Sequence, residues 1–95
     1  MAGAISAGVQ GSSRIETSSV RLIVGREPPA DLVVADAEVS RRHSMLVNDD
    51  ERWWLIDLKS KNGTFSAGKR VVSTEIGPGD VFVIGASKIK LISNY

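Results

Sequence analysis

The apolar residues of this chain come in short runs that turn-forming residues interrupt, and this pattern excludes most helical folds. Val81-Phe82-Val83-Ile84, for example, lies between Gly77-Pro78-Gly79-Asp80 and Gly85-Ala86-Ser87. No stretch shows a helical period over about ten residues, and the segment 33–39 is short and rich in valine, a poor helix former. We therefore expect an all-β chain, because many short strands separated by regularly spaced turns are typical of a β-sandwich.

The strands that this pattern predicts cover most of the chain. They are expected at residues 4–9 (an edge strand), 14–17, 20–24, 32–34, 44–47, 52–58, 64–65, 70–72, 81–84 and 88–92. Asn48-Asp49-Asp50-Glu51 is expected to form a hairpin turn. Both alternating faces of 53–58 are largely apolar, which predicts a central strand covered on both sides. Residues 1–3 are expected to be a frayed, disordered end, and residues 4–95 a single domain.

The charged residues are nearly balanced overall but unevenly placed. Twelve Lys and Arg against eleven Asp and Glu give a formal net charge of +1. That value argues against nucleic acid as a partner, since nucleic-acid-binding domains usually carry a strongly basic face. Many of the cations fall in the segments 25–26, 40–43 and 57–64, namely Arg26, Arg41, Arg42, Lys59 and Lys61. We expect a locally positive field where these segments meet.

Other features of the composition exclude several classes of site. The chain has no cysteine and one histidine, so a disulfide framework, a thiolate metal site and a histidine-based zinc site are not expected. No apolar run approaches the ~18 residues of a membrane span. The first residues lack the basic segment and apolar core of a signal peptide. We therefore expect no metal, no cofactor, no membrane partner and a cytoplasmic location.

The residue types in the three segments point to a phosphate group carried by a partner chain. Arg26 presents paired N–H donors in one plane, which suits a phosphate better than any other side chain does. The Ser40 hydroxyl can donate to a phosphate oxygen, while Arg41 and Lys61 add charge at the rim. His43 is expected to brace its loop through the ring nitrogens.

Two alternatives compete with this interpretation. A hydrolase would use Ser40 as its nucleophile and His43 as the base, but it also needs a strained elbow, an orienting acid and an oxyanion hole. There is no G-x-S-x-G, and two arginines follow Ser40, so we predict no catalytic residue.

Asn62-Gly63-Thr64 could be a glycosylation acceptor, a plain turn, or a loop in which Asn62 faces a bound peptide and Gly63 supplies a positive φ.

Taken in order, the motifs of the chain resemble those of the forkhead-associated (FHA) domain. The matching residues are Gly25-Arg26, Ser40-x-x-His43, Asp57-Leu58-x-Ser60-x-Asn62-Gly63-Thr64, Gly79-Asp80 and Ile84-Gly85. They cover residues 20–92, the motif-bearing part of the predicted domain. The resemblance implies a β-sandwich of two twisted, mainly antiparallel sheets, with about eleven short strands and the binding loops at one end.

The resemblance also implies recognition of phosphothreonine in a partner protein, such as a Ser/Thr kinase or its substrate, as part of signal transduction. Carried over by position, the resemblance implies that Arg26 and Ser40 bind the phosphate directly and that Arg41 and Lys61 contact or surround it. It implies that Asn62 forms a hydrogen bond with the peptide main chain. The residues implied to shape the loops are Gly25, His43, Gly63 and Thr64. The chain is expected to be a monomer. The alternative is an assembly domain of the same fold that needs no phosphate and pairs through exposed sheet edges.

Two residues outside the motifs carry further expectations. Ser66-Ala67-Gly68 stands where the family commonly has Asn-Gly, in a turn expected to lie far from the phosphate loops. Glu38 precedes the Ser40 loop, and we expect it to disfavour acidic residues on the downstream side of a bound peptide.

Overall fold

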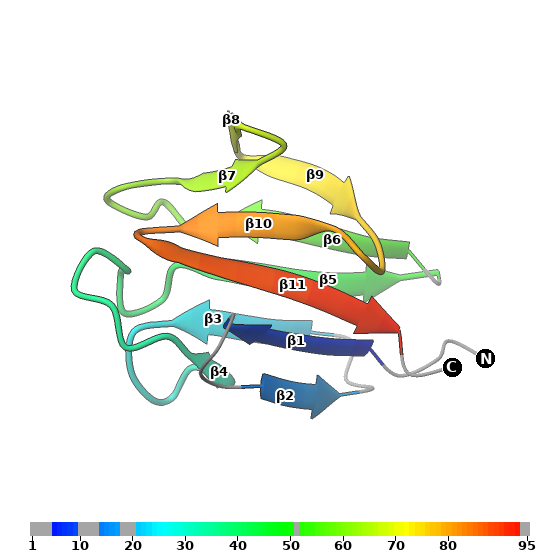
Figure 1. Ribbon diagram of the computed structural model, residues 1–95, viewed down its shortest axis with the longest axis horizontal. Helices are drawn as coiled ribbons and strands as arrows, with labels where there is room; N and C mark the ends of the chain where they lie inside the picture. The colour runs from blue at the N-terminus through cyan, green and yellow to red at the C-terminus, as the bar shows by residue number, and fades with distance from the viewer. Residues whose placement is uncertain (1–4, 10–13, 18–20, 51, 94–95) are drawn as a thin grey trace.

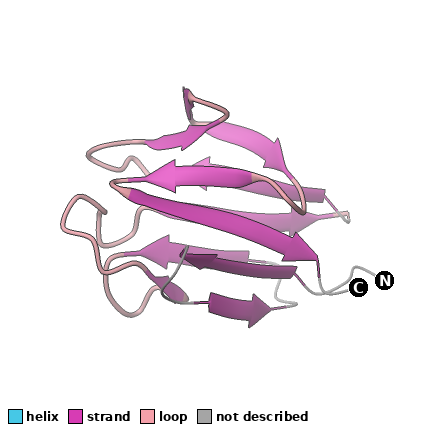
Figure 2. Cartoon of the chain, viewed as in Figure 1, coloured by secondary structure: helices cyan, strands magenta, loops and turns pink. Residues whose placement is uncertain are grey.

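The computed structural model describes residues 5–9, 14–17, 21–50 and 52–93, and every regular element in these ranges is a β-strand (Figures 1 and 2). The strands are β1 (Ile5–Val9), β2 (Arg14–Thr17), β3 (Arg21–Gly25), β4 (Leu32–Val33), β5 (Ser44–Asp49), β6 (Arg52–Asp57), β7 (Thr64–Ser66), β8 (Lys69–Val71), β9 (Ser73–Ile76), β10 (Val81–Ile84) and β11 (Ser87–Ser93). The predicted all-β fold is confirmed. The frayed end predicted at residues 1–3 lies outside the described residues.

Two sheets form the two layers of a sandwich (Figure 1). One sheet has the order β2-β1-β11-β10-β7-β8 and the other β4-β3-β5-β6-β9. All strand pairs are antiparallel except β3 with β4. The prediction of an edge strand at 4–9 is wrong, because β2 pairs with the side of β1 that β11 leaves free.

The core lies between the sheets and is built from alternate residues of the strands, as the period of a strand requires. The five-stranded sheet contributes Leu22, Val24, Leu46 and Leu55, and the six-stranded sheet contributes Phe82, Ile84, Ile89 and Leu91. None of these side chains is more than 2% exposed. A continuous apolar layer of this kind is the main source of stability in a small domain.

The outer face of β6 shows where the apolar pattern misled the prediction. Trp53 and Leu55 are buried in the core, but Trp54 and Ile56 on the opposite face are only half-buried. Strands β5 and β9 flank β6, so it is interior within its sheet. A two-layer sandwich nevertheless has no third layer to cover the outer face, and the expected burial of both faces is wrong.

Strand β9 was not predicted from the sequence. Its residues Ser73, Thr74 and Glu75 are polar, and only Ile76 is buried, at 3% exposure. The segment is a strand because it pairs with β6 along its whole length. Hydrogen bonds to the neighbouring strand β6, rather than an apolar pattern, therefore determine its conformation.

The segments singled out in the sequence meet at one end of the sandwich, on the left of Figure 1. Strands β3 and β6 end there, β5 and β7 begin there, and the β10–β11 turn lies at the same end. The β3–β4 loop (26–31), the β4–β5 loop (34–43) and the β6–β7 loop (58–63) are consequently neighbours.

Candidate functional site

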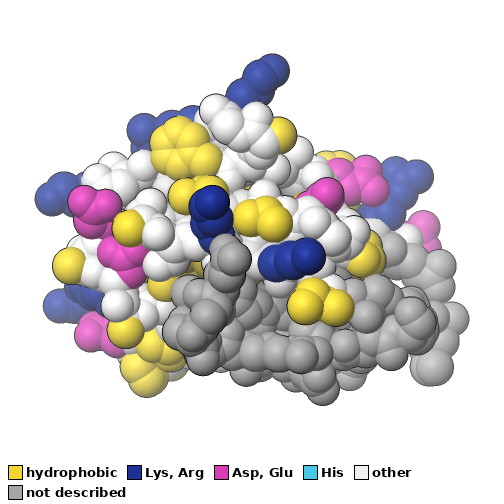
Figure 3. Space-filling view, in the orientation of Figure 1, with side chains coloured by type: hydrophobic (Ala, Val, Ile, Leu, Met, Phe, Trp, Pro, Cys, Tyr) yellow, Lys and Arg dark blue, Asp and Glu magenta, His cyan; other side chains and the backbone are white. Residues whose placement is uncertain are grey.

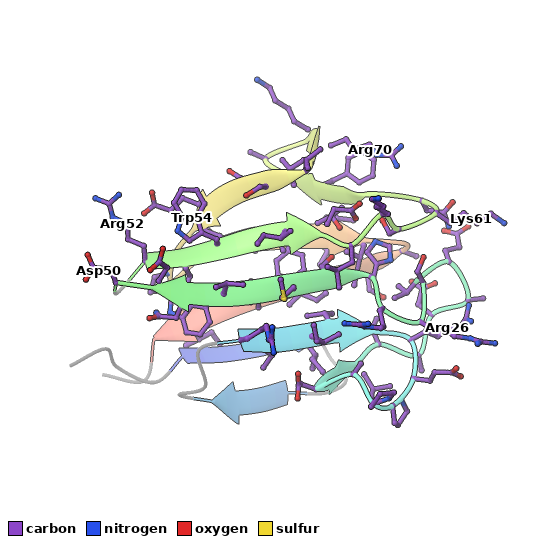
Figure 4. All side chains as sticks on the ribbon, turned by 180° about the vertical axis from the view of Figure 1, so that it is seen from behind. Arg26, Asp50, Arg52, Trp54, Lys61 and Arg70 are labelled. Carbon is purple, nitrogen blue, oxygen red and sulfur yellow. The ribbon has the colours of Figure 1, made fainter. Side chains whose placement is uncertain are left out.

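A groove of about 350 Å³ opens at this loop end of the sandwich. Its lining consists of Arg26, Ala37, Glu38, Val39, Ser40, Lys61 and Asn62. The β3–β4, β4–β5 and β6–β7 loops all contribute, and Figure 4 shows the Arg26 and Lys61 side chains at the same end of the molecule. Four of the residues predicted to contact phosphate or peptide are thus brought together: Arg26, Ser40, Lys61 and Asn62.

Arg26 is held differently from the other arginines that the structure describes. It is half-buried, whereas Arg21, Arg41, Arg42, Arg52 and Arg70 are exposed. Its backbone N–H donates to the Ser40 carbonyl oxygen over 3.0 Å, which joins the β3–β4 loop to the β4–β5 loop. Gly25 makes this approach possible, because a Cβ at that position would collide with the carbonyl oxygen of Arg41.

Among the residues that the structure describes, the Ser40 hydroxyl has one hydrogen-bonding partner, and its proton is free. Its Oγ accepts a hydrogen bond from the Lys61 backbone N–H over 3.1 Å. A hydroxyl has one proton to donate besides its acceptor lone pairs. Ser40 can therefore donate that proton to an anion in the groove while its oxygen keeps the β6–β7 loop in place.

His43 is fully buried and joins two loops through its ring. The Ser40 N–H donates to Nδ1 over 3.0 Å, and Nε2 lies 2.8 Å from the Gly63 carbonyl oxygen. Because a backbone N–H can only donate and a carbonyl can only accept, the ring is the neutral tautomer with its proton on Nε2. Both ring nitrogens are occupied by backbone, so His43 is not placed to take a proton from the Ser40 hydroxyl.

A second group of polar side chains holds the β6–β7 loop from beneath, centred on the Asp57 carboxylate. Thr64 Oγ1 donates to Asp57 Oδ1 over 2.7 Å, the Ser60 hydroxyl donates to the same oxygen, and the Ser60 N–H donates to Oδ2. Since the Thr64 proton goes to Asp57, the Ser44 hydroxyl donates to Thr64 Oγ1, 2.7 Å away. Ser60 Oγ accepts from the Gly63 N–H, which closes the network.

These hydrogen bonds favour the ionised form of Asp57. Burial alone raises the pKa of the carboxyl, but the hydrogen bonds from Ser60 and Thr64 more than offset it and leave the pKa below its ordinary value. Thr64 was predicted to shape its loop, whereas Asp57 and Ser60 matched the motif without a predicted role. The available signal was the spacing Asp57-x-x-Ser60, since an aspartate often accepts from the backbone a few residues further on.

Asp36 is the other residue that the sequence analysis missed. Its Oδ1 accepts from the Glu38 N–H over 2.9 Å, and its Oδ2 accepts from the Ala86 N–H over 2.8 Å and from the Ser87 hydroxyl over 3.0 Å. The backbone hydrogen bonds from Glu38 and Ala86 lower the pKa of Asp36. The carboxylate thus ties the β4–β5 loop to the β10–β11 turn of the opposite sheet. No local pattern connects residues so far apart in the chain.

Asn62 and Arg41 are each engaged with another part of the protein. Asn62 Nδ2 donates to the Glu38 carbonyl oxygen over 2.8 Å, which leaves one amide proton and Oδ1 for a ligand. Arg41 Nε lies 3.2 Å from Glu27 Oε1, with 76% of the arginine side chain exposed. Arg41 does not line the groove, so the structure does not bring this predicted phosphate contact together with Arg26 and Ser40.

The surface at the loop end carries both signs of charge. Figure 3 shows Lys and Arg beside Asp and Glu there, which matches the small net charge of the chain. Among the residues that the structure describes, no group of His, Cys, Asp and Glu could hold a metal ion. Within the same residues there is no helix of the length and apolarity needed to span a membrane.

Comparison with known proteins identifies relatives of the whole described fold. A family model for the FHA domain matches residues 22–85. FhaB of Mycobacterium tuberculosis is 30% identical over 88 residues, which are 92% of this chain and 57% of FhaB. The oxoglutarate dehydrogenase inhibitor of Corynebacterium jeikeium is 27% identical over 86 residues, 90% of this chain and 60% of the inhibitor.

Solved structures agree with these relatives. The first FHA domain of Rv1747 from Mycobacterium tuberculosis superimposes with a TM-score of 0.88 at 26% identity, over 100% of both chains. A domain studied for phosphothreonine-dependent FHA interactions gives a TM-score of 0.86 at 28% identity, over 94% of this chain and 95% of that one. This chain spans only part of its curated relatives, from 8% of the Rv1747 transporter protein to 60% of the inhibitor.

Proposed function

The chain belongs to the FHA domain family, and from this membership we propose that it is a phosphothreonine-dependent interaction module that binds phosphorylated segments of a partner protein. One observation carries the proposal: a single groove is lined by the half-buried Arg26, by Ser40 and by Lys61. The Ser40 hydroxyl keeps its proton available for a ligand, because its oxygen accepts the hydrogen bond from the Lys61 N–H. A structural neighbour was studied for phosphothreonine-dependent interactions, and another FHA domain, FhaA, was solved in complex with the intracellular domain of Rv3910. Both support this function.

The chemistry of the groove suits a phosphate dianion. Arg26 provides two parallel N–H donors, Ser40 provides a hydroxyl donor, and Lys61 provides a positive charge at the rim. Each charge-assisted hydrogen bond is worth about 1.5 to 3 kcal/mol. Two or three such bonds, together with peptide contacts, are enough for micromolar affinity, which corresponds to about −8 kcal/mol.

The remaining predicted contacts have supporting roles. Asn62 can bind the peptide main chain with its free amide proton and Oδ1. Arg41 can turn toward the phosphate at little cost, since its exposed pair with Glu27 is worth at most about 1 kcal/mol. The methyl group of threonine would distinguish it from serine, because burying one methyl contributes about 1 kcal/mol.

Catalysis is not part of the proposed function. The Ser40 and His43 side chains do not form a nucleophile–base pair, since backbone groups occupy both ring nitrogens. We propose a regulatory binding domain, and the similarity to an oxoglutarate dehydrogenase inhibitor supports such a role. The location in the cytoplasm and the monomeric state stay predictions from the sequence.

Calorimetry with a phosphothreonine peptide and its unphosphorylated counterpart tests the proposal. We expect binding of the phosphorylated peptide alone, and we expect Arg26→Ala or Ser40→Ala to weaken it by about 100-fold, because each removes a charge-assisted hydrogen bond. Arg52→Ala is the matched control, since Arg52 is exposed at the other end of β6 (Figure 4).

Unchanged affinity in both Arg26→Ala and Ser40→Ala would contradict the site. Partner capture from a cell extract that survives phosphatase treatment would instead favour the phosphate-independent assembly domain.

A further inference from the structure

The outer face of the five-stranded sheet carries an apolar stripe that no described segment covers. Figure 4 looks onto this face, with Trp54 labelled. Alternate residues of a strand share a face, and the apolar ones on this face are Ile23, Met45, Val47, Trp54 and Ile56. All five are only half-buried. A contiguous apolar surface of this kind is a mark of an interaction site, whereas isolated apolar side chains are ordinary on a protein surface.

Charged side chains flank the stripe in an order that the strand register fixes. One row across strands β3, β5, β6 and β9 consists of Arg21, Val47, Trp54 and Glu75. The row thus runs from a cation through two apolar residues to an acid, and both charged residues are exposed. Because three strand spacings separate them, the backbones of Arg21 and Glu75 are roughly 14 Å apart within one molecule.

The neighbouring rows complete the pattern. Toward the β5–β6 hairpin, Asp49 of β5 is paired with Arg52 of β6, and both are exposed. Toward the loop end, the row has no charge and consists of Ile23, Met45, Ile56 and Ser73. Each charged row therefore has opposite charges on the two sides of a line that runs between β5 and β6.

A second copy of this chain is complementary to such a face. A twofold axis that lies along the strands, over the line between β5 and β6, exchanges β5 with β6 and β3 with β9. Arg21 of one copy then faces Glu75 of the other copy, and Asp49 faces Arg52, while the apolar residues meet in the centre. A twofold interface requires that each contact be made twice in this reciprocal way, and both charged rows satisfy the requirement.

The outer face of the six-stranded sheet lacks this complementarity. The exposed charged residues that the structure describes on its outward-facing rows are Lys88 and Lys90 of β11 and Arg70 of β8. All three are cations, and Figure 3 shows Lys and Arg among apolar side chains on this face. Two copies that docked through it would repel each other. The charge pattern therefore selects the five-stranded sheet.

We propose that this chain forms a symmetric homodimer through the outer face of its five-stranded sheet. The face is only about four strands wide and four residues long, so its area is at the low end of specific interfaces, and we expect a dissociation constant on the order of 100 µM. The sequence predicts a monomer, and the self-complementary face is the reason to expect a dimer at high concentration. The inference does not depend on phosphopeptide binding, because the groove lies at the loop end.

The symmetry has a consequence for binding, which rests on the proposed function. An axis along the strands leaves the strand direction unchanged, so the loop ends of both copies lie at the same end of the dimer. The two phosphate grooves then open on one side. A partner that carries two phosphothreonines can occupy both grooves, and the second binding event benefits from the high effective concentration.

Sedimentation velocity from about 10 µM to about 1 mM tests the dimer without any peptide. We expect the wild type to associate over this range. Arg21→Glu and Glu75→Arg should each raise the dissociation constant about tenfold or more, because each replaces two attractions between the copies by two repulsions. The double variant should restore association. Since the two residues are remote within one molecule, such a restoration requires contact between copies.

Lys88→Glu is the matched control, because it reverses a charge on the outer face of the other sheet. It should leave association unchanged. The proposal is overturned if the wild type stays monomeric at about 1 mM. It is also overturned if both single reversals leave association unchanged, or if the double variant associates as weakly as the single variants do.

A peptide series with two phosphothreonines joined by flexible linkers of increasing length tests the arrangement of the grooves. At a concentration where the wild type is dimeric, we expect the best linker to bind it about tenfold more tightly than it binds Glu75→Arg. A peptide with one phosphothreonine should bind both proteins equally.

The two experiments separate the failure of this inference from that of the proposed function. If the wild type associates but no phosphopeptide binds, the proposed function is wrong and the dimer stands. If single phosphothreonine peptides bind but no linker gives a gain in the dimeric wild type, the axis along the strands is wrong and the proposed function stands.

Discussion

The loops at the binding end and the tight turns elsewhere are held in different ways. The binding loops depend on side chains that reach across the fold, such as His43 to Gly63 and Asp36 to Ala86. The β9–β10 turn is closed by the Asp80 N–H, which donates to the Gly77 carbonyl oxygen, and by the Gly77 N–H, which donates to Asp80 Oδ2. Its remaining backbone hydrogen bonds go to Leu91 of the adjacent strand β11. A short turn can thus be held by its own residues and a neighbouring strand, whereas a long loop needs side chains from other loops.

This difference implies that the binding loops can be loosened by single buried substitutions that would do little in a tight turn. Three separate loops supply the residues that line the groove. Buried polar side chains therefore provide the preorganisation that reduces the entropic cost of binding.

The largest effect is expected for His43→Ala. The substitution leaves the Ser40 N–H and the Gly63 carbonyl without partners and creates a cavity, which together should lower the free energy of unfolding by about 3 kcal/mol. Urea denaturation measures the loss, and phosphopeptide affinity should fall as well. Asp80→Ala is the control, because it removes one exposed hydrogen bond in a local turn. If His43→Ala lowers the free energy of unfolding no more than the control does, the binding loops do not depend on buried polar side chains more than a tight turn does.

A smaller, pH-dependent effect is expected for Asp57→Asn. The pKa of Asp57 is lower in the folded protein than in the unfolded chain, so the carboxylate stabilises the fold above its unfolded pKa and loses this contribution as the pH falls through the folded pKa. The substitution should cost about 1 to 2 kcal/mol at pH 7. The difference from the wild type should shrink as the pH falls below the ordinary pKa of an aspartate and through the lower pKa of Asp57 in the folded protein.

Denaturation curves at several pH values measure this difference, with Asp50→Asn as a control at an exposed hairpin turn. A gap between wild type and Asp57→Asn that stays constant down to acid pH would show that ionisation of Asp57 does not stabilise the loop.

The smallest effect is expected in the β7–β8 hairpin, where Ala67 has φ 52° and Gly68 has φ 78°. Positive φ at both central residues is the type I′ geometry, which favours Asn-Gly. Ala67→Asn should therefore raise the free energy of unfolding by about 0.5 to 1 kcal/mol. Phosphopeptide affinity should not change, since this turn does not line the groove. An altered affinity would show that the hairpin and the binding loops are coupled.

Much of the fold could be predicted because its signals are local. The run Val81–Ile84 between two turns is a strand in the structure, as expected. Strand β9 was missed because its polar residues carry no apolar alternation, and the position of β1 was missed because strand order is not encoded in any one segment. Residues in contact within a short segment leave a pattern, whereas sheet neighbours far apart in sequence do not.

The candidate site shows the same difference between features with a local signal and features that depend on long-range contacts. The motifs located Arg26, Ser40, Lys61 and Asn62, and the structure places all of them in one groove. Their order along the chain did not reveal that Arg41 pairs with Glu27, or that Asp36 joins the loop to the opposite sheet. It also did not show that Arg42 and Lys59 line one cavity together with Asp57.

The amino-acid sequence alone determined that this protein is an all-β member of the FHA family and which residue types its binding loops carry, because turn chemistry, strand alternation and short motifs are properties of neighbouring residues. Only the tertiary structure decided which cations enter the groove and which pair with carboxylates. The physical reason is that electrostatic energy depends on distance and burial, and both are set by how strands remote in sequence pack together.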